Sequence, residues 1–184
     1  MSHQQNDIGV TITSDLKWSA HIQNICQKPN RTNGFLKRNL NIVNSDIKVK
    51  AYTALVRPTV EYARSVWDPH FQKDKLEMIH MRSAMYVTNR YHNNSSVETM
   101  LQKLQWPTLE ERRKKDRLTL RYKVANGEVD IDAGNKLLPP DRLSRHTNAH
   151  YFQISSCKTS IRKESYYPTT IRDWNNLPAP VAAV

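Results

Sequence analysis

The sequence has few of the residues that organise disulfide-rich or zinc-stabilised folds. It contains only two cysteines and four glycines in 184 residues. Cys26 and Cys157 are far apart and belong to no CxxC or Cys/His pattern, so nothing indicates a disulfide framework or a structural zinc site. This cysteine usage favours a reducing, intracellular compartment, while the dispersed basic residues do not distinguish nucleus from cytoplasm.

Long apolar runs are also missing. No stretch approaches the ~18 apolar residues that a membrane-spanning helix needs. The residues that follow Met1, SHQQND, lack the apolar core of a signal peptide. Neither secretion nor membrane insertion is therefore expected.

The side chains that catalysis would need are not grouped in the sequence. Two-metal chemistry requires paired carboxylates, and the nearest pair, Asp130 and Asp132, follows an expected helix end, where solvated loop side chains are predicted. His146 and His150 are four residues apart and could bind zinc with Cys157 only if a further ligand or an open position existed, so surface histidines are expected. We expect no metal, no cofactor and no catalysis by this chain alone.

Positive charge is abundant. The chain has 28 Lys and Arg against 17 Asp and Glu, a net charge of +11, and a pI near 9.8, which favours polyanionic partners. Between residues 28 and 64 there are eight basic residues and two acidic ones, and between 110 and 123 there are seven and three. These two segments are the candidates for contacts with nucleic acid.

Arginines recur at helical spacing in the second of these segments. Arg113, Arg117 and Arg121 lie opposite an apolar line of Leu118, Tyr122 and Ala125 and could meet successive phosphates. The alternative is a solvated helix stabilised by the i, i+4 pairs Glu110–Lys114 and Glu111–Lys115. Both interpretations place the arginines on an exposed face.

Periodicity predicts one short strand followed by helices. Ile8, Val10 and Ile12 alternate with polar residues, as in a half-buried strand for which no partner is evident nearby. From residue 19 the period becomes helical, and Pro29 should kink or break that helix. Further helices are expected at 45–57, 60–67, 76–88, 97–104 and 108–126.

The helix over 108–126 has the clearest limits. Thr108 and Glu111 form a T-x-x-E capping box, and Gly127 stands where a left-handed C-terminal cap would fall. After it, a strand over 151–161 and a short helix over 168–177 are expected. Ring size and position predict that the tryptophans pack at the edges of a core; they are Trp18, Trp67, Trp106 and Trp174.

The predicted fold class is mainly α: a helical bundle with a short N-terminal strand and an irregular, aromatic-rich C-terminal segment. Cys26 lies beside the apolar stripe of its helix and is expected to be a buried, unreactive thiol.

Several separated blocks resemble one family. They are GVTITSDLKWSAHI, GFLKRNL, LVRPTVEYARSVWDP, SVETMLQKLQWPTLEERR and TTIRDWNNLP, and together they run from Ile8 to about Ala179. In this order they resemble the region that follows the polymerase core of LINE-type, jockey-like non-LTR retrotransposon reverse transcriptases. Met81 and Met85 depart from the pattern, because relatives commonly have arginine there.

The resemblance implies an organisation and a partner. Residues 1–18 would be a remnant strand of the polymerase palm side, 19–126 a helical, thumb-like domain that closes over template and primer, and 127–184 a C-terminal extension. The palm would be the partner domain in the parent RNA-directed DNA polymerase.

Three functions follow as alternatives. The first is a truncated C-terminal fragment that binds RNA or RNA/DNA hybrid nonspecifically, with Arg57, Arg64, Arg113, Arg117 and Arg121 as phosphate contacts. The second is a helical protein-interaction module without nucleic-acid binding. The third is a gene-model fragment of an active reverse transcriptase.

Overall fold

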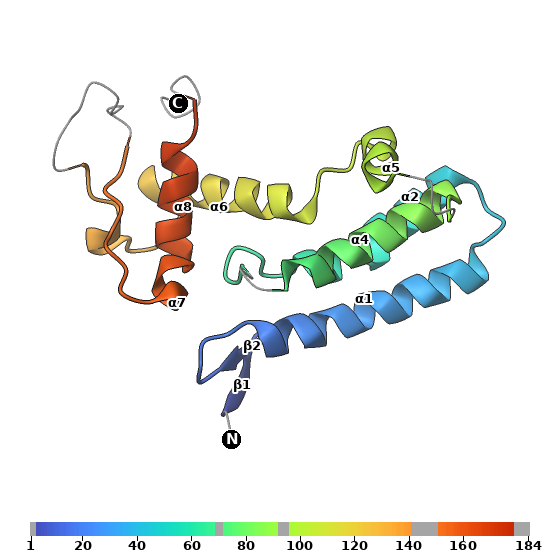
Figure 1. The fold of residues 1–184 in the computed structure, drawn as a ribbon, viewed down its shortest axis with the longest axis horizontal. Coiled ribbons are helices and arrows are strands. Elements are labelled where there is room, and N and C mark those ends of the chain that lie inside the picture. Colours follow the sequence, from blue (N-terminus) through green and yellow to red (C-terminus); the bar gives the residue numbers. More distant parts are fainter. Residues whose placement is uncertain (1–2, 69–71, 92–95, 141–150, 179–184) are drawn as a thin grey trace. The chain divides into compact units, whose positions relative to one another are not determined.

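The computed structural model describes residues 3–68, 72–91, 96–140 and 151–178, and it is mainly helical with a short antiparallel hairpin near the N-terminus (Figure 1). The chain forms two compact units, Met1–Arg112 and Arg113–Val184. This boundary falls within one helix and differs from the boundaries after residues 18 and 126 that the sequence suggested. The reasons are that the hairpin docks onto the first helix and that later segments pack around the second half of α6.

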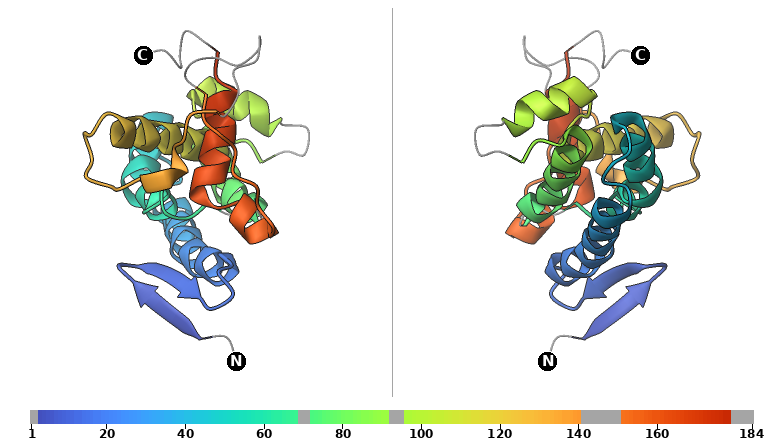
Figure 2. Two further views of the ribbon diagram at one scale, coloured as in Figure 1. Left: turned by 90° about the vertical axis from the view of Figure 1, so that its left-hand side faces the viewer. Right: turned by 90° about the vertical axis from the view of Figure 1, so that its right-hand side faces the viewer.

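The first unit contains the hairpin and most of the helices. Strand β1 spans Gln4–Asp7 and β2 spans Val10–Thr13, and the helices are α1 (Ser19–Asn39), α2 (Ser45–Leu55), α3 (Arg57–Glu61), α4 (Lys73–Thr88), α5 (Val97–Leu104) and the start of α6 (Leu109–Ala125). Helices α1, α2 and α4 pack against one another, and the hairpin lies at the N-terminal end of α1 (Figure 2).

The hairpin supplies the strand partner that the sequence did not reveal. Gln4 pairs with Thr13 and Asp7 with Val10 around a turn at Ile8 and Gly9, whose φ angles are 44° and 79°. Two consecutive positive φ values are those of a type I′ turn, which suits the twist of a tight hairpin. A side chain at Gly9 would also approach the Tyr62 ring to 3.3 Å, so glycine meets two requirements there.

The alternation expected for β2 is largely inverted. Val10 is buried, but Ile12 is 37% exposed while Thr11 and Thr13 are buried. Polar contacts to the start of α1 explain this: Thr11 donates its backbone N–H to His21 Nδ1 at 3.1 Å, and Asn24 donates to the Thr11 hydroxyl. Hydrogen bonding to α1, rather than apolar burial, fixes the face of the strand.

Helix α1 continues through Pro29. The helix extends without interruption from Ser19 to Asn39, and Pro29 is buried within it, so the expected break is wrong. The lost amide hydrogen bond is offset because the same face packs in the core on both sides of the proline, through Ile22, Cys26 and Leu36. Burial raises the pKa of the Cys26 thiol, which confirms the expected buried thiol.

The buried face of α2 is shifted by one residue from the predicted stripe. Ile47 and Leu55 are about half exposed, whereas Lys48, Tyr52 and, just beyond the helix, Val56 are buried. Lys48 can be buried because its ammonium donates to Asn89 Oδ1 at 2.7 Å and lies 5.0 Å from the centroid of the Tyr86 ring.

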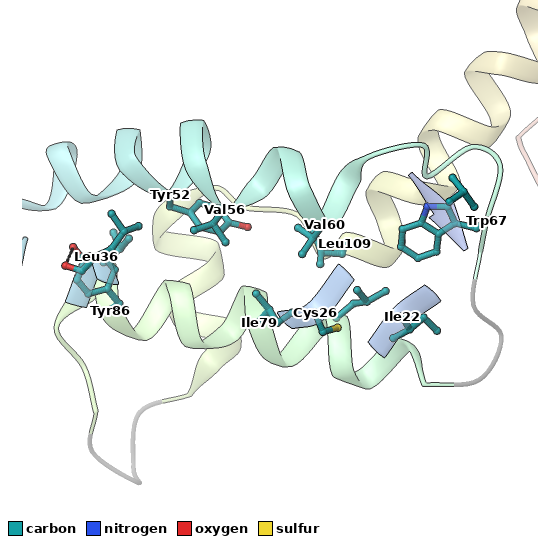
Figure 3. Close-up of a cluster of buried hydrophobic side chains, with 13 residues drawn as sticks. Ile22, Cys26, Leu36, Tyr52, Val56, Val60, Trp67, Ile79, Tyr86 and Leu109 are labelled. Carbon is teal, nitrogen blue, oxygen red and sulfur yellow. Dashed lines mark hydrogen bonds between the residues drawn. The ribbon is translucent and has the colours of Figure 1, made fainter. Parts of the chain in front are cut away.

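The core of the first unit lies between α1, α2, α3 and α4 (Figure 3). The Tyr86 hydroxyl, 3.1 Å from the carbonyl oxygens of both Leu36 and Leu40, donates to the C-terminal end of α1. Trp67 is fully buried and donates its indole N–H to the Tyr62 carbonyl at 2.9 Å. Trp18 and Trp106 pack against the same core, as predicted.

The second unit contains the rest of α6, the 3₁₀ turn η1 (Gly134–Lys136), α7 (Ser160–Lys163) and α8 (Tyr166–Asn175). Gly127, with φ of 69°, follows α6 as predicted, and α8 confirms the closing helix. The strand expected over 151–161 is wrong, because 151–157 has no regular structure. Phe152 instead exchanges two backbone hydrogen bonds with the Asn175 side chain, at 3.0 and 2.8 Å, which replaces a partner strand.

Two histidines are buried in the first unit. His80 Nδ1 lies 2.7 Å from the Tyr52 hydroxyl and Nε2 lies 3.2 Å from the Pro107 carbonyl; in the neutral ring, Nε2 donates to that carbonyl and Nδ1 accepts from Tyr52. Burial lowers the pKa of His80 to about 4; the hydrogen bond to the Pro107 carbonyl acts against this shift, and the positive charge of Arg57 adds to it. Burial also lowers the pKa of His21.

We expect the unfolding free energy to fall on acidification. The pKa of His80 is lower in the folded than in the unfolded state, so its contribution is complete above about pH 6.5 and is lost as the pH falls towards 4. Urea unfolding at pH 7, 6 and 5 should show a slope of up to ~1.4 kcal/mol per pH unit from this one group. His80→Gln should flatten it, and an unchanged slope would contradict the assignment.

Candidate nucleic-acid interface

Three arginines of the first unit share one carboxylate. Glu61, at the end of α3, accepts hydrogen bonds from Arg57 Nε at 3.0 Å and from Arg112 Nη1 at 2.5 Å. It also forms an ion pair with Arg64, whose Nη1 lies 3.0 Å from Glu61 Oε1. The Glu61 side chain is 13% exposed and the three arginine side chains are 17–33% exposed. We call these four residues the Glu61 cluster. Its formal charge is +2, which makes it a partly exposed, positively charged site.

The two sequence blocks position this cluster. Arg57 and Arg64 lie within the LVRPTVEYARSVWDP block, where the short helix α3 places Glu61 four residues after Arg57 and three before Arg64. Arg112 comes from the first turns of α6, in the WPTLEERR segment. Thus the separated blocks meet at one carboxylate in the folded chain.

Two sets of hydrogen bonds cap the start of α6. Thr108 and Glu111 form the predicted capping box, with Thr108 N donating to Glu111 Oε2 at 3.0 Å and Glu111 N donating to Thr108 Oγ1 at 3.1 Å. The Glu77 carboxylate of α4 accepts two further backbone N–H groups at this end, those of Leu109 and Glu110. These caps orient the first turn that carries Arg112.

An aromatic stack holds the segment that precedes α6. The Trp106 ring stacks on Tyr52, with centroids 4.4 Å apart, and on His80, at 5.3 Å. Because both partners belong to helices of the core, the stack fixes the chain just before the capping box. By holding the backbone that leads into α6, Trp106 helps to determine where Arg112 lies.

The second unit uses its arginines internally. Arg117 Nη2 lies 2.7 Å from Asp173 Oδ2, and Lys114 Nζ lies 3.5 Å from the other oxygen of that carboxylate. The Arg121 guanidinium lies between two rings, 3.5 Å from the centroid of Trp174 and 4.1 Å from that of Phe152. Burial lowers the pKa of Arg121 to about 10.

The exposed arginine face predicted for α6 is therefore wrong. Arg113, Arg117 and Arg121 are only 3%, 6% and 6% exposed, while Ala125 on the supposed apolar line is exposed. For two of them the physical reason is a specific partner, because Asp173 pairs with Arg117 and the rings of Trp174 and Phe152 lie against Arg121. Phosphate contact by these three arginines stays a prediction, and phosphates would have to compete with these internal partners.

The sequence-predicted site residues thus fall into two sets. Arg57 and Arg64 come together, with Arg112 as a third member that the sequence did not single out. Arg113, Arg117 and Arg121 belong to the second unit. No group of three or more metal-ligating side chains occurs within the described residues, and His146 and His150 lie outside them.

The solvent face of α1 is a second basic surface, and its cations belong to the basic segment 28–64 although none of them was among the predicted phosphate contacts. The signal is present in the sequence, because no Asp or Glu occurs between Asp15 and Asp46 while five Lys and Arg do. In α1 itself, Lys28, Arg31 and Arg38 are exposed. A basic helix face without carboxylates has no local neutralising partner on its own helix.

The Asp130–Asp132 pair is exposed, and Asp132 accepts a hydrogen bond from the Gly134 amide, as expected of loop carboxylates. Among the helices in the described ranges, none has the length and apolar character needed to span a membrane.

Comparison with known proteins gives no relative. No protein-family model, no curated protein and no solved structure matches the chain.

We expect Glu61→Gln to destabilise the first unit by about 1–2 kcal/mol, because the variant keeps the shape of the side chain but leaves three guanidinium groups facing one another without a carboxylate. Urea unfolding measures the loss. The exposed Glu98 of α5 provides the control, since Glu98→Gln should cost only a few tenths of a kcal/mol. Equal effects of the two substitutions would show that the cluster contributes nothing to stability.

Proposed function

We propose that this chain corresponds to the C-terminal, thumb-like part of a LINE-type reverse transcriptase and that it binds RNA or RNA/DNA hybrid through backbone phosphates. The observation that carries the binding proposal is the exposed, carboxylate-free basic face of α1, in a chain with a net charge of +11. The Glu61 cluster adds a second positive site in the same unit. Nonspecific phosphate contact is what such a distribution favours.

The family assignment is supported by the way the sequence blocks are used. LVRPTVEYARSVWDP and WPTLEERR meet at Glu61, and Asp173 and Trp174 of the TTIRDWNNLP block hold Arg117 and Arg121. The blocks thus mark a scaffold, as expected for a non-catalytic segment. In this proposal polymerisation is carried out by a palm domain with paired carboxylates, and the present chain holds the nucleic acid through its backbone phosphates.

A binding titration across a salt series tests the proposed function. A fluorescently labelled RNA/DNA hybrid is titrated with the purified chain, and anisotropy gives the affinity at 50, 100 and 200 mM NaCl. Neutralising three phosphates should lower the affinity about 40-fold over this range. A folded, monodisperse sample that does not bind at 50 mM, or whose binding does not depend on salt, would contradict the proposal.

A protein-interaction module is the second candidate. Three large apolar side chains of the first unit favour it, because Ile8, Leu16 and Ile42 are 82%, 62% and 96% exposed. If this is the main role, the chain should self-associate with increasing concentration in light scattering and should fail to bind the hybrid. In a full-length enzyme the palm domain would be the natural partner for exposed apolar side chains of this kind.

A further inference from the structure

The solvent face of α1 carries an exposed aromatic ring among its cations. Lys28, Arg31, Phe35 and Arg38 are separated by three, four and three residues, so they form one stripe along the helix. All four are exposed, and Phe35 has 54% of its surface accessible. From Lys28 to Arg38 the stripe is about 15 Å long.

Phe35 is not needed for the core of this unit. Its neighbour Leu36 is 1% exposed and supplies the packing on the opposite face, with Ile22 and Cys26. A half-exposed phenylalanine in a helix interior adds neither helix propensity nor full burial, so a polar residue would suit a purely solvated face better. An exposed ring between cations is the arrangement that stacks on bases.

The surroundings of the ring keep cations close to it. The Arg38 guanidinium lies over the adjacent turn of the helix, since its Nη1 is 3.5 Å from the place where a Cβ on Gly34 would be. On the α4 side, the exposed Arg82 donates to Asn30 Oδ1 at 3.5 Å and adds another cation at the edge of α1. Asn24, Gln27 and Asn39 are the other exposed polar side chains near the stripe.

We propose that the solvent face of α1 binds single-stranded RNA or DNA, with Phe35 stacking on an unpaired base and Lys28, Arg31 and Arg38 contacting the flanking phosphates. This inference rests on the proposed function and specifies both its site and its substrate. The ring selects single strands because the faces of bases are hidden inside a duplex, whereas every unpaired base offers a face for stacking. Recognition is expected to be tolerant of sequence, since no base edge is read.

An anionic membrane surface is the competing partner for a basic helix with an exposed aromatic residue. An interfacial helix needs a continuous apolar face to insert among lipid tails. The apolar face of α1 is already committed to the core, and Phe35 is the one large apolar side chain on its exposed stripe. The interleaved Asn, Gln and Arg side chains favour a nucleic-acid strand.

The test compares the unchanged chain with three variants on two probes. The probes are a fluorescein-labelled oligo(U) RNA and an RNA/DNA hybrid of equal length, measured by anisotropy. Phe35→Leu should weaken oligo(U) binding about fivefold or more and change hybrid binding less than twofold. The double variant R31Q/R38Q should flatten the salt slope on oligo(U) by about 1.4. The double variant K103Q/R162Q removes the same charge from exposed positions elsewhere. It should change neither the salt slope on oligo(U) nor the part of the oligo(U) affinity that comes from stacking on Phe35.

Each alternative result has a definite meaning. Unchanged oligo(U) affinity in Phe35→Leu overturns the stacking role, and equal effects of R31Q/R38Q and K103Q/R162Q overturn the location on α1. Binding to the hybrid but not to oligo(U) overturns this inference and leaves the proposed function standing, while binding to neither probe overturns both. The face would be assigned to membranes by two results together: the chain does not bind oligo(U), and it cosediments with phosphatidylserine vesicles whereas Phe35→Leu does not. Far-UV circular dichroism and thermal melting verify that all variants are folded.

Discussion

The Glu61 carboxylate joins segments that lie about 50 residues apart in the chain. It pairs with Arg57 and Arg64 beside α3 and with Arg112 in the first turns of α6. The Glu61 carboxylate offsets the repulsion among the three guanidinium groups, so it helps to hold the first turn of α6 beside α3 within the first unit. The capping box at Thr108 and the Trp106 stack also help to position Arg112 near Glu61, because they fix the backbone that precedes and begins α6.

The same principle explains the second unit. Asp173 pairs with Arg117 and Trp174 stacks on Arg121, so these two residues of the TTIRDWNNLP block serve the fold. Cations in both units are thus divided between those with internal partners and those on an open surface. The cations of the α1 stripe lie on the open surface, and their helix has no carboxylate. For this reason we propose that nucleic acid binds at α1 and not at α6.

Local sequence signals predicted the helices well where capping and periodicity agreed. Residues Leu76, Ile79 and Ser83 of α4 are buried as expected, and both caps of α6 formed where Thr108 and Gly127 indicated. Predictions failed where a tertiary partner decided the outcome. Pro29 remained helical because its face is buried, and Lys48 is buried because its ammonium donates to Asn89 and lies over the Tyr86 ring. Arg117 and Arg121 turned inward towards partners about 30 to 56 residues away in the sequence. No single-segment pattern contains that information.

Photo-cross-linking most directly tests whether nucleic acid contacts the first unit on α1. A 4-thiouridine-containing oligo(U) is bound to the chain, irradiated and digested with trypsin, and the cross-linked peptides are identified by mass spectrometry. The account predicts that the peptide of residues 32–37, which contains Phe35, is a principal product. Cross-links confined to peptides from residues 113–178, with none in α1, would contradict it and return the binding site to the second unit.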